Sequence, residues 1–134
     1  MIALLDTNIL IASTTEGEQL PDLTGFDDLV VSSLSYSELR MGIASTTELR
    51  LYRQREARLS EIVSVYGDGI PYDDAAATCY GAITTAVADR GGLPKARRMD
   101  RMIAATALLH NCALITRNIR DFSDIADMVE VIQR

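Results

Sequence analysis

The chain begins with an unbroken apolar run that ends in a carboxylate. Met1 to Leu5 contains no polar side chain, and Asp6, Thr7 and Asn8 follow it directly. A strand that is apolar at every position has to be covered on both faces, as in the parallel sheets of α/β proteins. Such sheets bind their ligands at the carboxyl ends of the strands. The run therefore predicts a buried strand that delivers Asp6 to that edge of a sheet.

The rest of the chain alternates short apolar runs with amphipathic segments. This alternation predicts an α/β fold, in which helices cover both faces of one parallel sheet. The length of 134 residues fits a single domain, residues 1–134. We expect about five strands, at residues 1–5, 27–33, 70–72, 112–116 and 129–132, the third of them short and at an edge because Pro71 cannot donate to a ladder. Helices are expected at residues 7–15, from Ser35 through Ile43, and at 47–66, 74–89 and 101–110.

Composition excludes several classes of protein and site. The only histidine, His110, argues against histidine-rich metal sites and a Ser-His-Asp triad. Cys79 and Cys112 lack the paired spacing of a zinc site, and we expect both to be free, buried thiols. No apolar run approaches the ~20 residues that span a bilayer, and no signal-like segment opens the chain. We therefore expect a cytoplasmic protein with no membrane partner.

Acidic and polar residues stand where the predicted strands end. Asp6 ends the first strand, Glu38 follows the second, and Asn118 and Asp121 follow the strand that ends at Thr116, while Asp100 opens the preceding helix. Carboxylates that lie close together repel one another, and a cation relieves the repulsion. Oxygen ligands select hard cations such as Mg²⁺ or Mn²⁺, which can activate water and hold a phosphodiester. The pattern thus favours hydrolysis of nucleic acid.

Each acid also has a structural interpretation. Asp6, Asp73, Asp100 and Asp121 stand where a helix N-cap is expected. The spacing of Ser35 and Glu38 is that of a capping box, in which Glu38 would be the third helical residue. Taken singly, each acid is explained by capping; their shared position at strand ends favours a site.

Four stretches of the chain resemble, in order, the successive motifs of PIN-domain ribonucleases, and most closely those of the VapC toxins of bacterial toxin–antitoxin pairs. The resemblance covers essentially the whole chain and implies a PIN-like three-layer sandwich. The four stretches are Leu4 to Ile11, Val31 to Gly42, Asp100 to Leu108, and Leu114 to Phe122.

The resemblance also implies an activity and a site. It implies an endoribonuclease toxin that cleaves RNA with Mg²⁺ or Mn²⁺, is neutralised by a cognate VapB-like antitoxin, and forms a homodimer. Asp6, Glu38 and Asp100 match three of the family's metal-binding acids. Some relatives have an aspartate where this chain has Asn118, so either Asn118 or Asp121 is the fourth group.

Other polar residues are given supporting roles. Asn8 and Thr116 match positions that orient the acids and water. The net charge of −6 opposes nonspecific binding to a polyanion, so RNA cleavage requires local positive charge. The arginine-rich helix at 47–66 is farther from the acids in sequence, and could contact the antitoxin or a second copy of the chain. The arginines that flank Asp100 and Asn118 are the candidate substrate contacts: Arg97, Arg98, Arg101 and Arg117.

Two alternatives stay open at this point. The first is a catalytically silent PIN module that acts by protein binding, for which the neutral Asn118 is the only support. The second is a receiver-type phosphoacceptor domain, which also gathers acids at strand ends. A receiver needs an acidic pair after the first strand and a lysine late in the chain, and the lone Lys95 is poorly placed for that role.

Overall fold

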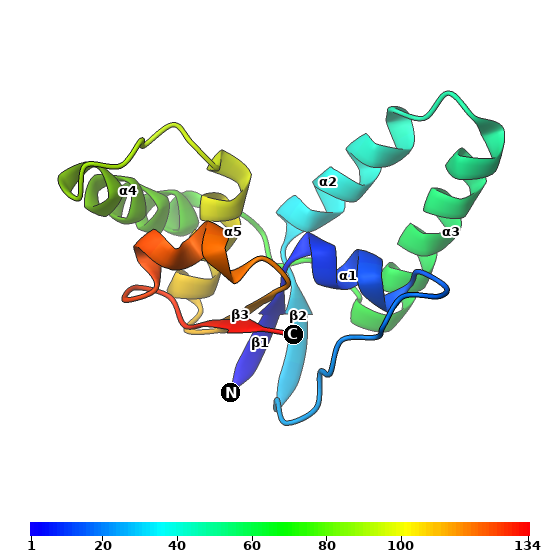
Figure 1. Cartoon of the computed structure of the whole chain (residues 1–134), viewed down its shortest axis with the longest axis horizontal. Helices are drawn as coiled ribbons and strands as arrows, with labels where there is room; N and C mark the ends of the chain where they lie inside the picture. Colours follow the sequence, from blue (N-terminus) through cyan, green and yellow to red (C-terminus); the bar gives the residue numbers. More distant parts are fainter.

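The computed structural model of the protein describes residues 1–134 and contains one sheet of four parallel strands (Figure 1). The strand order is β2-β1-β3-β4, which places β1 inside the sheet. Leu5 of β1 is in register with both Val31 and Ile115, so the residues that follow these three positions emerge at one edge. The strands are β1 (Ile2–Leu5), β2 (Asp28–Val31), β3 (Ala113–Thr116) and β4 (Val131–Gln133).

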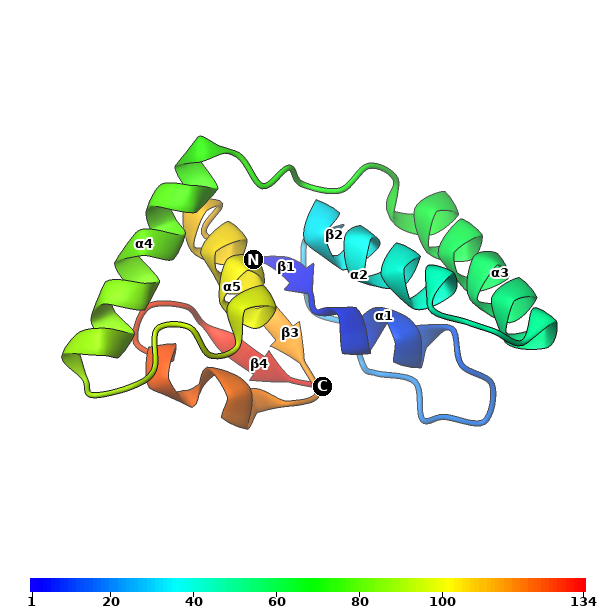
Figure 2. The same cartoon turned by 90° about the horizontal axis from the view of Figure 1, so that it is seen from above.

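Helices cover both faces of the sheet, as predicted. In Figure 2, α1, α2 and α3 lie on one side of the strands, and α4, α5 and the 3-10 helix η1 lie on the other. None of the helices is both long enough and apolar enough to cross a membrane. The helices are α1 (Thr7–Ser13), α2 (Ser33–Ala44), α3 (Leu49–Tyr66), α4 (Asp74–Asp89), α5 (Arg98–Leu109) and η1 (Ile119–Ile125).

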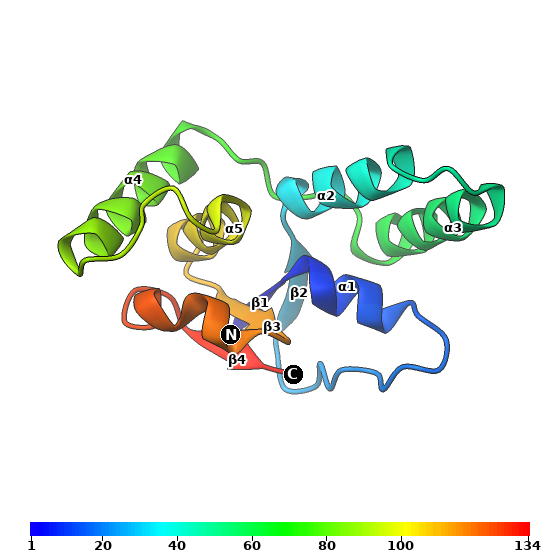
Figure 3. The ribbon, with the colours of Figure 1, turned by 45° about the horizontal axis from the view of Figure 1, so that its top comes forward.

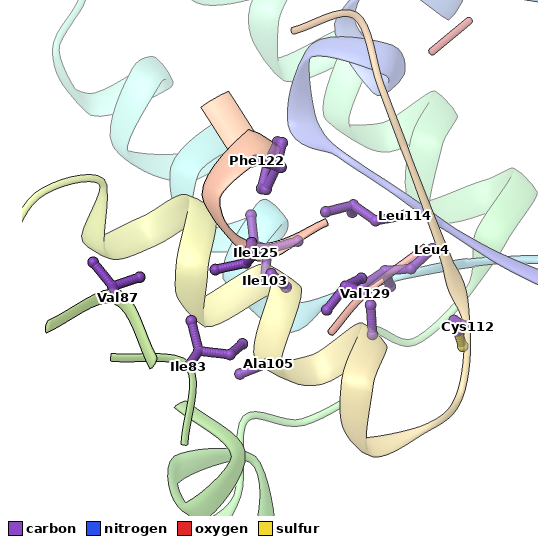
Figure 4. Close-up of a cluster of buried hydrophobic side chains, with 12 residues drawn as sticks. Leu4, Ile83, Val87, Ile103, Ala105, Cys112, Leu114, Phe122, Ile125 and Val129 are labelled. Atoms are coloured by element: carbon purple, nitrogen blue, oxygen red, sulfur yellow. The ribbon is translucent and has the colours of Figure 1, made fainter. Parts of the chain in front are cut away.

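The apolar strands feed two separate cores because successive side chains of a strand point to opposite faces. Leu4 and Leu114 join the core under α4, α5 and η1, where Phe122 and Ile103 are fully buried (Figure 4). Leu5 belongs to the second core, beneath the other three helices. The prediction that the first strand is covered on both faces is therefore confirmed. The residues that complete the second core around Leu5 are Ala3, Ile9, Leu10, Val31, Leu39, Leu59, Ile62, Ala113 and Ile115.

The predicted fifth strand at residues 70–72 is wrong in its extent. Only Ile70 pairs with the sheet, through one isolated bridge to Ser32 beside β2. Its amide donates to Val31 O at 2.7 Å, and its carbonyl accepts from Ser33 N at 2.9 Å. Pro71 has no amide proton to continue the ladder, so the pairing stops after one residue. The segment does lie at the sheet edge, as predicted.

The predicted start of α2 is also corrected. Ser32 is the N-cap, and its Oγ accepts a hydrogen bond from Leu34 N at 3.1 Å. Ser35 is therefore the third helical residue, and Glu38 lies too far along the helix to belong to a capping box. The caps predicted at Asp6 and Asp73 are confirmed by hydrogen bonds from Thr7 N and Ala76 N. With the box excluded, Glu38 has no capping role.

Candidate active site

Asp6 is held in a fixed orientation at the carboxyl end of β1. It is 5% exposed, its Oδ1 accepts from Thr7 N at 2.9 Å, and its Oδ2 accepts from Thr116 Oγ1 at 2.8 Å. Thr116 Oγ1 in turn accepts from Asn8 Nδ2 at 3.2 Å and from Asn118 N at 3.1 Å. A hydroxyl has one proton and two lone pairs, so the Thr116 hydroxyl is fully used. The predicted orienting roles of Asn8 and Thr116 agree with these contacts.

Glu38 reaches the same edge from the second turn of α2. Its Oε1 accepts a hydrogen bond from Thr7 Oγ1 at 2.7 Å, and Ser35 Oγ lies 3.0 Å from the same hydroxyl. Because Thr7 directly follows Asp6, the first helical turn of α1 links the two acids. Thr7 is a site residue to which the sequence interpretation gave no role, although its place between Asp6 and Asn8 was a usable signal.

Asp100 approaches from the opposite side of the sheet. It lies in the first turn of α5, whose N-cap is Arg97 in the left-handed region at φ 52°, so the predicted cap at Asp100 is wrong. Its carboxylate accepts no hydrogen bond from the chain. Figure 3 shows α1, α2 and α5 gathered around the same part of the sheet. Three acids far apart in sequence are thereby brought to one place.

The acids share one electrostatic environment. Burial raises the pKa of Asp6 above its ordinary value of 3.8, and the charges of Glu38 and Asp121 raise it further, against the hydrogen bonds from Thr116 and Thr7. Burial also raises the pKa of Asp100, as do the charges of Asp6 and Asp121, while nearby arginines oppose that rise. Since burial and neighbouring charges make Asp6 and Asp100 harder to ionise, a cation at this edge would stabilise their charged forms.

The two candidates for the fourth group differ in position. Asn118 is the exposed N-cap of η1, and its backbone amide, not its side chain, bonds to Thr116. Asp121 lies in the first turn of η1, so the cap predicted there is also wrong. The negative charge of Asp121 raises the pKa of both Asp6 and Asp100. Its carboxylate lies 3.6 Å from Arg97 Nη1. Charge and position therefore favour Asp121, and the fourth group stays a prediction.

Comparison with known proteins fits this geometry. A family model described as "PIN domain" matches residues 3–128. The chain belongs to the PIN-domain family. This PIN domain is 33% identical over 133 residues to "Ribonuclease VapC5" of Mycobacterium tuberculosis, which covers 96% of this chain and 93% of that protein. It is 25% identical over 137 residues to "Ribonuclease VapC2" of Rickettsia felis, with 96% of each protein covered.

Solved structures are similar over the whole PIN domain. VapBC-5 from M. tuberculosis, described as a member of the VapBC family of toxin–antitoxin systems, has a TM-score of 0.80 at 27% identity and covers 99% of this chain and 98% of that chain. FitAcB from Neisseria gonorrhoeae has a TM-score of 0.79 at 28% identity, covering 98% and 96%. The predicted family, its VapC resemblance and the PIN-like fold are confirmed. The match gives the receiver-type alternative no support.

The acids of this PIN domain offer oxygen ligands alone. No three of its Asp, Glu, His and Cys side chains are grouped closely enough to hold an ion by themselves. Mg²⁺ ordinarily keeps several waters and takes only one or two carboxylates directly, so this open arrangement suits it better than an all-protein cage would. The raised pKa values of the buried Asp6 and the half-buried Asp100 add an electrostatic reason for a cation. Asp6, Glu38 and Asp100 are the residues that could hold it.

The predicted substrate arginines do not share one environment. Arg101 is wrong as a substrate contact, because it is 3% exposed and its guanidinium lies 2.9 Å from Asp124 Oδ2 and 2.7 Å from Leu93 O. Arg117 is partly exposed and pairs with Glu18 at 3.2 Å. Arg97 and Arg98 are both exposed and close to Asp100 in sequence. Arg97 forms an ion pair with Asp121, and Arg98 forms none. Arg97 and Arg98 therefore stay candidates for contact with a polyanion.

Proposed function

We propose that this PIN domain is a Mg²⁺- or Mn²⁺-dependent endoribonuclease that acts as the toxin of a toxin–antitoxin pair. The observation that carries the proposal is the meeting of Asp6, Glu38 and Asp100 at one sheet edge, from segments separated by up to 94 residues. The likeness to a relative named Ribonuclease VapC5 supports RNA as the substrate.

The chain's own residues suggest how hydrolysis would proceed. A bound ion would neutralise the acids and polarise the phosphodiester. The hydrogen bonds from Thr116 to Asp6 and from Thr7 to Glu38 orient the two acids before the substrate binds. Glu38 uses Oε1 to accept from Thr7, which leaves Oε2 free to take the proton of the attacking water. The water oxygen bonds to phosphorus, the bond from phosphorus to the leaving ribose oxygen breaks, and that oxygen takes up a proton.

We also propose a protein partner. The likeness to VapBC-5, a structure of a toxin–antitoxin system, supports a cognate VapB-like antitoxin that binds this chain and blocks its site. A homodimer is proposed on the family resemblance alone. Size-exclusion chromatography with light scattering measures the mass of the protein alone, which tests the homodimer, and of the protein co-expressed with a candidate VapB-like antitoxin, which tests the complex.

The catalytic test uses Asp100→Asn. Asp100 accepts no hydrogen bond within the chain, so this change removes charge without breaking an internal contact. Asp6→Asn is a weaker choice, since an amide facing Thr116 Oγ1 finds both lone pairs already used. The matched control is Asp73→Asn, an exposed N-cap acid at the start of α4 whose cap an asparagine preserves.

The measurement is cleavage of labelled RNA by purified protein with Mg²⁺, with Mn²⁺ and with EDTA. We expect wild type and Asp73→Asn to cut RNA with either metal and to stop with EDTA, and Asp100→Asn to lose at least about a hundredfold in rate. Cleavage that survives both EDTA and Asp100→Asn would overturn the proposed site. Absence of cleavage together with no calorimetric Mg²⁺ or Mn²⁺ binding would instead identify a silent PIN module.

A further inference from the structure

A pocket of about 370 Å³ adjoins the acids on the side of α2 and α3. Thr7 and Glu38 form part of its wall, and both belong to the hydrogen-bonded site described above. Arg55 and Arg58 of α3 form another part of the wall. A group bound in this pocket would therefore lie next to Glu38 and within reach of two arginine side chains.

Neither arginine has an anionic partner in the chain. Both are half-buried, and no carboxylate oxygen lies within 4.0 Å of either guanidinium. Arg55 Nη1 donates to Gly42 O at 2.6 Å, and Arg58 has only a 3.4 Å contact to Thr15 Oγ1. The Arg58 Nε is buried without any hydrogen-bond partner. Partly desolvated cations of this kind are stabilised by an anion that enters from outside.

Two acidic residues near Arg58 could have formed an ion pair with it, in place of an anion from outside the chain. Glu16 and Glu61 line the adjoining cavity that Arg58 also borders, yet neither forms an ion pair with it. Arg58 therefore forms no ion pair although two carboxylates line a cavity that it borders. The other arginines of α3, Arg50 and Arg53, are exposed and line neither cavity.

We propose that Arg55 and Arg58 form a subsite for a phosphate of the RNA strand, adjacent to the phosphate that is cut. The inference rests on the proposed ribonuclease function and adds a substrate contact to it. Because the pocket shares Thr7 and Glu38 with the site, an anion bound in it belongs most simply to the molecule being cleaved. The planar guanidinium forks suit the paired oxygens of a phosphodiester. An RNA strand would then cross the acids between α3 and the exposed arginines of α5.

The test measures RNA binding separately from RNA cleavage. Full-length protein carrying Asp100→Asn is titrated against fluorescently labelled single-stranded RNA by anisotropy, at several KCl concentrations. The variant pair is Arg55→Gln with Arg58→Gln, and the matched control is Arg50→Gln with Arg53→Gln on the same helix. We expect the pocket pair to weaken binding at least about tenfold. We also expect it to lower the slope of log K against log salt by about 0.7, since the subsite neutralises one phosphate and each neutralised phosphate of a single strand contributes about 0.7.

A second measurement uses the active background. There, the pocket pair should raise KM much more than it lowers kcat, because the subsite binds the strand outside the reacting bond. Loss of the Gly42 contact could unfold the double variant, so Arg58→Gln alone is measured too, as its only contact is 3.4 Å long. It should lower the salt slope by less than the pocket pair does, with an unchanged melting temperature.

The outcomes separate this inference from the proposed function. If wild type cuts RNA but the pocket pair changes binding no more than the control pair, the subsite is wrong and the ribonuclease stands. If the pocket pair loses antitoxin binding while RNA binding is unchanged, the arginines serve a protein partner and the subsite is again wrong. If wild type neither binds nor cuts RNA, the proposed function itself fails.

Discussion

At the scale of single residues, the Thr116 hydroxyl is the centre of the site. It connects the end of β3 to Asp6, 110 residues away, and to Asn8 and the backbone of Asn118. A buried hydroxyl that satisfies three partners cannot be removed without leaving polar groups unpaired. The orientation of Asp6 therefore depends on a residue that takes no part in the chemistry.

Thr116→Val tests this dependence. The change keeps the shape of the side chain and deletes the hydroxyl, so we expect a loss of about 1–3 kcal/mol in the free energy of unfolding, together with slower RNA cleavage. Urea denaturation and the cleavage assay measure the two effects. Thr116→Ser keeps the hydroxyl and serves as the control. A valine variant as stable and active as the serine variant would contradict this role.

The raised pKa of Asp100 gives a second residue-scale prediction. Burial, followed by the charges of Asp6 and Asp121, raises its pKa above the ordinary 3.8 in the folded protein. As pH rises, the carboxyl of Asp100 therefore loses its proton in the unfolded chain before it does so in the folded protein. Its contribution to the free energy of unfolding falls as pH rises from 3.8 through the raised pKa. In metal-free buffer, Asp100→Asn should be more stable than wild type at pH 7, and this gain should shrink as pH falls below 3.8.

Urea denaturation in EDTA at pH 3.5, 5 and 7 measures the difference between Asp100→Asn and wild type. Asp73→Asn is the control for removal of an aspartate charge. An Asp100→Asn protein that is less stable than wild type at pH 7 would show that the carboxylate stabilises the metal-free fold.

At the scale of elements, close approach of backbones fixes how the segment after α3 passes the sheet. A Cβ at Gly69 would lie 2.7 Å from Ser33 N and 2.9 Å from Ser33 Cα, at the start of α2. Only glycine lets Ile70 come near enough to form its bridge with the end of β2. The position of α2, and with it Glu38, therefore depends on a residue in a connecting segment.

Gly69→Ala should destabilise the fold by about 1–3 kcal/mol, because backbone atoms rather than a flexible side chain have to move. Gly81→Ala is the matched control, since Gly81 is an exposed position of α4 with no atom within 4 Å of an added Cβ. There, we expect a gain of about 1 kcal/mol from helix propensity. Thermal and urea unfolding measure both, and equal effects of the two changes would refute the packing argument.

At the scale of the whole molecule, the site joins the two helical layers. Asp6 and Glu38 belong to the layer of α1 and α2, whereas Asp100 belongs to α5 across the sheet. An ion held directly by one or two of these acids, and through bound water by the rest, would stabilise the folded state, in which alone the acids meet. The proposed metal would therefore stabilise the folded protein as well as support catalysis.

Mg²⁺ at about 100 times its dissociation constant should add about 2.7 kcal/mol to the free energy of unfolding of wild type. The same concentration should add clearly less to Asp100→Asn, because one of the proposed ligands is lost. Thermal melts across a Mg²⁺ titration measure this, with NaCl at matched ionic strength as the control for screening. An equal rise in both proteins would place the bound ion away from Asp100.

Much of the architecture followed from local sequence patterns. The apolar run at residues 1–5 and the helical periods predicted a parallel sheet covered on both faces, because a wholly apolar strand has no face for water. The polar residues after each strand predicted the edge where Asp6, Glu38 and Thr116 meet. The strand predicted at residues 70–72 was too long, because Pro71 has no amide proton and the pairing ended after one bridge at Ile70.

Other features depended on the tertiary structure. Local patterns were enough to predict that acids gather at the ends of parallel strands, because the direction of the strands fixes that edge. Only the folded chain decided that Arg101 is buried against Asp124, that Ser32 rather than Ser35 caps α2, and that Thr7 joins Asp6 to Glu38. The first and third of these outcomes depend on contacts between residues more than 20 positions apart, which spacing along the chain does not show. The second is local, but several serines in the same stretch could have been the cap. The position of Asp6 at the end of a strand could be predicted from the first six residues. Its hydrogen bond from Thr116 and its nearness to Glu38 follow from how the chain packs.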